Sequence, residues 1–211
     1  MSNGLSTMGR YPITVAALAC AVLASCLGGP GIEPRYFSAT AAFDANLEAA
    51  QPDADEVYLI ELQPVRVVGH LRERMVWRDG AGEVGFREDR RWSEDPAGLL
   101  ARGLEAALAA APGVGAAPAA AEWSLSVTLE QFGELRATDT RAEVGLRATL
   151  VDRRGRVVLQ RQFSASEPVA DDDPGALVRA LGAELADQVQ LLLAAVEDEL
   201  AARGVARTAF R

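Results

Sequence analysis

Three runs in which apolar and polar residues alternate constrain the fold of this 211-residue chain more than any other feature. They occupy residues 123–130, 143–150 and 157–163, with a single exception in the last run. Successive side chains of a strand point to opposite faces, so this period is typical of strands with one buried face. The runs predict an antiparallel sheet with one solvent-exposed face and one buried face, and a turn at 152–155.

Two helices are predicted from an aspartate followed by a proline. The pairs are Asp95-Pro96 and Asp173-Pro174. An N-cap carboxylate accepts a backbone N–H, and proline at the first helical position loses no hydrogen bond. Apolar stripes at helical spacing follow both pairs, and Gly204 is the predicted C-cap of the second helix.

The first part of the chain predicts further strands. Residues 35–38 favour a short strand, and residues 41–56 a loop or short helix. Residues 57–68 read as a strand in which Pro64 forces a bulge or an edge position, and residues 71–87 as a hairpin. The element order predicts an α+β fold, namely an antiparallel β-sheet with two α-helices packed on one face.

The N-terminus predicts an export signal with a lipid anchor. Arg10 precedes an apolar run at 13–23, which is shorter than the ~20 residues that span a bilayer. Leu23-Ala24-Ser25-Cys26 resembles the bacterial lipoprotein box. We expect cleavage before Cys26 and lipidation of its thiol. The alternative is an ordinary secretory signal with a chance cysteine.

These features divide the chain into three parts. Residues 1–25 are the predicted signal peptide, 26–34 a lipidated tether, and 35–211 a single periplasmic domain. The part after Cys26 contains no further cysteine. The net charge of −9 makes nucleic acid an unexpected partner, because phosphate backbones repel an acidic chain.

Three patterns suggest chemistry, and each has a plainer explanation. Residues 80–85 match G-x-G-x-x-G, but they fall in a hairpin turn instead of opening a helix. His70 is the only histidine, and one histidine makes neither a triad nor a metal site. Asp171-Asp172-Asp173 is explained by capping of the following helix. We therefore expect no catalytic residue, no metal and no cofactor; a hydrolase that uses carboxylates is an alternative based on acidic abundance alone.

The basic residues are concentrated between positions 72 and 91. As candidate docking residues for a partner or for lipid headgroups we select Arg72, Arg74, Arg78, Arg90 and Arg91, with Arg87 in the same segment. The alternative is a solvated sheet face that nearby acidic residues balance.

Several segments together resemble a known family. Cys26 and its Pro-rich tether are followed by Arg35-Tyr36-Phe37, and residues 91–96 (RWSEDP) open the first helix. Residues 141–163 form a strand–turn–strand, and residues 177–181 (LVRAL) begin the closing helix. This pattern resembles the auxiliary lipoproteins of ABC-type lipid transporters that work with MCE-domain proteins, the paraquat-inducible C-type family.

The resemblance implies a non-catalytic envelope component. Its expected partners are an MCE-domain protein, an ABC permease and an ATPase, with a phospholipid or other hydrophobic cargo, and it is a candidate homo-oligomer. Leu27 after Cys26, where an aspartate favours inner-membrane retention, resembles sorting to the outer membrane. An outer-membrane assembly lipoprotein, for lipopolysaccharide or barrel insertion, is the alternative.

Overall fold

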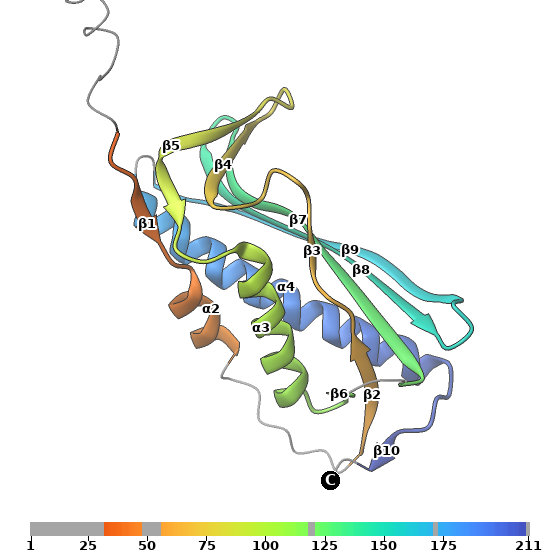
Figure 1. Ribbon diagram of the computed structural model, residues 1–211. Helices are drawn as coiled ribbons and strands as arrows, with labels where there is room; N and C mark the ends of the chain where they lie inside the picture. Colours follow the sequence, from red (N-terminus) through yellow and green to blue (C-terminus); the bar gives the residue numbers. More distant parts are fainter. Residues whose placement is uncertain (1–31, 48–55, 118–120, 171–172, 210–211) are drawn as a thin grey trace, which may run out of the picture. The chain divides into compact units, whose positions relative to one another are not determined.

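The computed structural model describes residues 32–47, 56–117, 121–170 and 173–209, and Pro34–Arg211 form one compact unit (Figure 1). The predicted signal peptide, Cys26 and most of the tether lie outside the described residues. In chain order the elements are β1 Arg35–Phe37, α2 Thr40–Leu47, β2 Glu56–Leu62, β3 Arg66–Val67, β4 Arg74–Asp79, β5 Val84–Trp92, α3 Pro96–Ala110, β6 Val114–Ala116, β7 Trp123–Arg136, β8 Thr140–Asp152, β9 Val157–Pro168, α4 Pro174–Ala202 and β10 Thr208–Ala209.

The sheet is mixed, so the predicted antiparallel sheet is wrong in part. β7, β8 and β9 form an antiparallel meander, as the alternating runs predict. On its other side β7 pairs in parallel with β2, β3 and β4, and β5 pairs in parallel with β1. The chain passes through α3 before it enters β7, and a crossover of that kind brings strands together in the same direction.

The described residues form three helices on one side of the sheet, where two were predicted (Figure 1). The additional helix is α2, in a segment that lacks a clear apolar period. It lies against α4 at Gly182, where a Cβ atom would come within 2.6 Å of the Ala39 carbonyl oxygen. It also contacts α3 at Gly103, where a Cβ atom would collide with the ring of Phe43. Two glycines on other helices therefore make room for α2.

The two predicted helices begin where the sequence places them. Asp95 accepts a hydrogen bond from the Ala97 N–H at 3.0 Å, and Asp173 from the Ala176 N–H at 3.0 Å. α4 ends before Gly204, whose φ of +67° favours glycine. The apolar stripe of α4 is buried against β8 and β9.

The β4–β5 hairpin explains the glycine motif at 80–85. Gly82 has a φ of +93° in the turn, and a Cβ atom at Gly85 would overlap the indole of Trp77. These glycines serve a turn and a close contact, as the plainer explanation predicts. Met75 and Val76 are both buried although they are neighbours in β4, because the pairing register shifts between Arg74 and Val76.

A hydrophobic core lies between the helices and the buried faces of β7 and β8. Trp92 and Trp123 belong to this core and are 5% and 8% exposed. The ring of Trp92 lies 4.9 Å from that of Phe132.

Between Leu129 and Gln131 the register of β7 shifts by a bulge, so the helix-facing positions change from odd to even. Glu134 consequently faces the helix side of the sheet.

Candidate functional site

A cavity of about 470 Å³ lies beside the last residues of β7. Its charged wall includes Arg87 and Arg90 of β5, Glu134 and Arg136 of β7, and Asp173 at the start of α4. The loop between β7 and β8, Val169 and Leu177 complete the lining. Three guanidiniums from two strands that are distant in sequence therefore line one cavity, together with residues at the start of α4.

A bulge in β5 brings two of these arginines to the cavity. Val76 pairs with Phe86, but Arg74, only two residues earlier, pairs with Arg91, five residues later. The extra residues of β5 lie between these pairs and include Arg87 and Arg90. Bulges of this kind redirect side chains and occur often beside functional sites.

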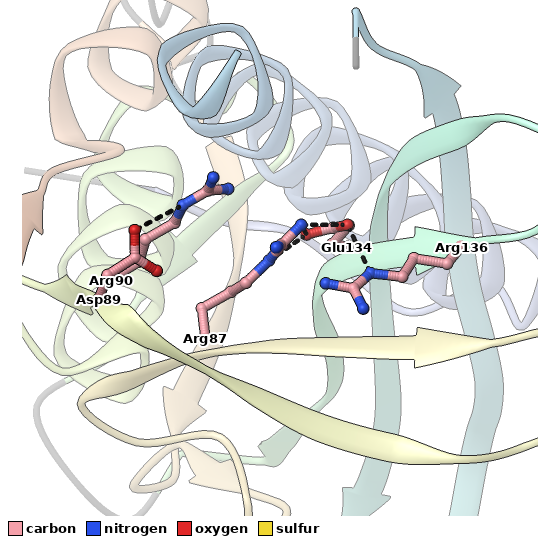
Figure 2. Close-up of polar contacts among 5 residues, drawn as sticks. All are labelled: Arg87, Asp89, Arg90, Glu134 and Arg136. Atoms are coloured by element: carbon pink, nitrogen blue, oxygen red, sulfur yellow. Dashed lines mark hydrogen bonds and ion pairs between the residues drawn. The ribbon is translucent and has the colours of Figure 1, made fainter. Parts of the chain in front are cut away.

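Glu134 is the buried centre of the arginine network. Its side chain is 3% exposed and accepts hydrogen bonds from Arg87 Nε at 3.0 Å and Nη2 at 2.8 Å. It also accepts one from Arg136 Nε at 2.8 Å (Figure 2). A buried carboxylate without cationic partners would be strongly destabilising. Two guanidiniums offset that cost here, and Glu134 in turn fixes the orientation of both.

Arg136 is held by a second contact. Its guanidinium lies 4.2 Å from the ring centroid of Trp77, within the range of a cation–π interaction. Gly85 leaves room on the neighbouring strand for the same indole. The Arg136 side chain is thus positioned by an aromatic face as well as by a carboxylate.

Arg90 differs from the other two arginines because its ionic contact is loose. Its side chain is 12% exposed, and Nε lies 3.7 Å from the Asp89 carboxylate (Figure 2). The buried Nε makes no hydrogen bond within the described part of the chain. A guanidinium nitrogen removed from water without an acceptor is energetically unfavourable.

The two aspartates of the cavity wall are already engaged. Asp139 accepts a hydrogen bond from Arg141 Nη1 at 3.0 Å. Asp173 caps α4, and its Oδ2 lies 3.8 Å from Arg179 Nη2. The N-terminus of the 29-residue helix α4 adds a partial positive charge to this wall.

The structure separates the five arginines that the sequence suggests for docking. Only Arg90 lines the cavity. Arg72 and Arg74 are exposed, and Arg74 lies 5.8 Å from the ring of Phe86. Arg78 forms an ion pair with Glu143 of β8, on the sheet face opposite the helices. Arg91 donates from Nη1 to the backbone oxygens of Arg87 and Arg90.

Sequence reasoning missed Glu134 and Arg136. The alternation of apolar and polar residues ends at Glu130, because the bulge that comes next reverses which positions face inward. His70 is exposed in the turn before β4. Asp171 and Asp172 lie outside the described residues. No group of three metal-binding side chains occurs within the ranges that the structure describes.

The chain belongs to the family of ABC-type transport auxiliary lipoprotein components, whose model matches residues 43–205. No curated protein sequence matches it significantly. No described helix is both long enough and apolar enough to cross a membrane.

Solved structures show the same fold. The crystal structure of protein XCC0632 from Xanthomonas campestris, assigned to family DUF330, has a TM-score of 0.67 and 15% identity, and the match covers 81% of this chain and 99% of that one. A second crystal structure, of an uncharacterized protein, has a TM-score of 0.59 and 16% identity, with 78% and 99% covered.

Proposed function

We propose that this chain is the membrane-anchored, periplasmic lipoprotein subunit of an ABC lipid transporter that includes an MCE-domain protein. The observation that carries the proposal is the family match over residues 43–205. An ABC permease and an ATPase are the further partners, and a phospholipid or another hydrophobic compound is the cargo. The outer membrane is the proposed location.

The lipid anchor is attached to Cys26 in this proposal. One acyl chain binds a membrane only reversibly, with a constant of about 10⁴ M⁻¹, whereas several chains hold a protein there stably. The Gly- and Pro-rich residues 27–34 then separate the folded unit from the lipid surface.

Cys26→Ser tests the anchor directly. The variant lacks the acceptor thiol, so we expect it in the soluble fraction or as an uncleaved precursor. Fractionation and intact-mass measurement distinguish these forms from the wild type. A Cys26→Ser protein of mature size that stays entirely in the membrane would contradict the anchor.

The role of the domain in the complex is docking. Guanidiniums stay protonated at neutral pH, so the cavity suits the binding of anions more than proton transfer. Polar and ionic side chains of this kind give an interface specificity and register. We therefore assign the chain no catalytic step.

The decisive experiment is a pull-down of the full-length, tagged protein from membranes in mild detergent, with mass spectrometry of proteins and lipids. We expect to recover an ABC ATPase, its permease and an MCE-domain protein. A strain that expresses the untagged protein is the control. Recovery of a barrel protein or a lipopolysaccharide-assembly protein in their place would move the assignment to envelope assembly.

A further inference from the structure

We propose that the cavity bounded by Arg87, Arg90 and Arg136 binds a phosphate group, either free phosphate or the phosphodiester of a lipid headgroup. This inference does not rest on membership of a transporter complex, because it concerns the isolated chain. Two observations carry it: the arrangement of three guanidiniums around a cavity of about 470 Å³, and the lack of a close counter-charge at Arg90, whose ionic contact is 3.7 Å long.

The cavity is organised before any ligand enters. Arg87 uses Nε and Nη2 on Glu134, and Arg136 uses Nε on the same carboxylate. In the described part of the chain, Nη1 of Arg87 and both terminal nitrogens of Arg136 have no other hydrogen bond. Donors already held in position lose little freedom when a ligand binds.

The charge balance of the lining favours an anion. Glu134 and Asp139 each have an arginine within 3.0 Å, and Asp173 caps α4. Arg90 has only the loose contact to Asp89. The cation that lacks a close counter-charge is therefore Arg90, and the N-terminus of α4 adds to the same positive potential.

The geometry favours phosphate over a simple carboxylate. Donors approach from β5 and from β7, so a ligand that accepts from all three arginines needs oxygens on more than one side. A tetrahedral phosphate presents oxygens in several directions, whereas a carboxylate presents two in one plane. The volume lies within the range of about 300–1,000 Å³ for small-molecule sites. Val169 and Leu177 add an apolar wall that suits the carbon part of a headgroup.

Isothermal titration calorimetry on the full-length protein in a neutral detergent tests the proposal. The two probes are inorganic phosphate and glycerophosphoglycerol, a soluble phosphodiester headgroup, each at constant ionic strength. We expect saturable binding of at least one probe. Arg90→Gln should weaken it about ten- to a hundredfold, as loss of a charge-assisted hydrogen bond does. Arg147→Gln is the matched control, because Arg147 pairs with Glu130 outside the cavity.

Each outcome decides a point. Binding of phosphate alone identifies free phosphate as the source, and binding of the diester identifies a headgroup. No saturable binding of either probe, or equal affinity in wild type and Arg90→Gln, overturns the proposal. If Arg90→Gln does not fold, Ala137→Trp decides, since the exposed Ala137 lines the cavity and an indole there should abolish binding. The pull-down can fail while this titration succeeds, so the two proposals are tested separately.

Discussion

The two ends of β7 face the same layer of helices but are built differently. Before the bulge its inward residues include Leu125, Val127 and Leu129, which are each at most 1% exposed. After the bulge they are Phe132 and Glu134, with Arg136 at the cavity. The first end is apolar packing, and the second is a network of ion pairs around an open space.

The two ends differ in what they contribute to the folded domain. Apolar packing stabilises a fold in proportion to the area buried, and many side chains of similar volume can supply it. A buried ion-pair network contributes little net stability unless its geometry is good, but it fixes the position of each charged group. The apolar end of β7 therefore holds the domain together, and the polar end presents oriented guanidiniums.

The largest expected effect is on the apolar end. Leu129→Ala removes a fully buried side chain and leaves a cavity, so it should lower the free energy of unfolding by about 2–5 kcal/mol. Chemical denaturation measures this change. Val157→Ala, at a residue that is 56% exposed, is the control and should cost under about 0.5 kcal/mol. Similar losses of unfolding free energy for Leu129→Ala and Val157→Ala would contradict the view that the apolar end of β7 holds the domain together.

The next effect is on the polar end. Glu134→Gln leaves Arg87 and Arg136 without their shared counter-charge and should destabilise the protein by about 1–3 kcal/mol. Both arginines keep partial access to water, which limits the cost. Glu130→Gln is the matched control, since Glu130 pairs with the half-exposed Arg147, and it should cost at most about 1 kcal/mol. A larger loss of unfolding free energy in Glu130→Gln than in Glu134→Gln would contradict the claim that the buried network around Glu134 contributes more to stability.

The smallest effect is a pH dependence at the junction of α2 and α3. The hydrogen bond from Arg102, with a further one from Thr40, lowers the pKa of Glu94 below its ordinary value of 4.5. The stability from this carboxylate is present above pH 4.5 and is lost as the pH falls through the folded-state pKa. Glu94→Gln should therefore reduce the loss of stability in acid, as followed by thermal melting below pH 4.5.

Glu184 provides a control of opposite sign. Burial, followed by the charges of Glu167 and Asp187, raises its pKa above 4.5. Ionisation of Glu184 therefore disfavours the folded state as the pH rises through that range. Glu184→Gln should leave the loss of stability below pH 4.5 unchanged. It should raise the free energy of unfolding at neutral pH. Identical pH profiles for Glu94→Gln and Glu184→Gln would contradict both assignments.

The sequence predicted the elements that local patterns specify. The alternation in β7, β8 and β9 and the capped starts of α3 and α4 are confirmed, because period and capping depend on nearby residues. The parallel pairing of β7 with β2 and β4 was not predicted, since it depends on a crossover through α3. Residues 41–56 are compatible with a loop or a short helix, because the position of α2 depends on Gly103 and Gly182, far along the chain.

The candidate site was harder to predict for the same reason. Two bulges, in β5 and after Leu129 in β7, determine which side chains reach the cavity. A bulge has no strong sequence signal, and one extra residue reverses the faces of everything that follows. The sequence indicated an arginine-rich segment, but not that Arg87 and Arg90 would meet Arg136.

The most direct test of the account is NMR of the arginine Nε–H groups during a titration with inorganic phosphate. The account predicts a saturable shift of the Arg90 signal, with smaller shifts at Arg87 and Arg136, while the signal of Arg147 on the open face stays in place. An Arg90 signal that does not move, or equal linear shifts at Arg90 and Arg147, would contradict the claim that the polar end of β7 is a binding site.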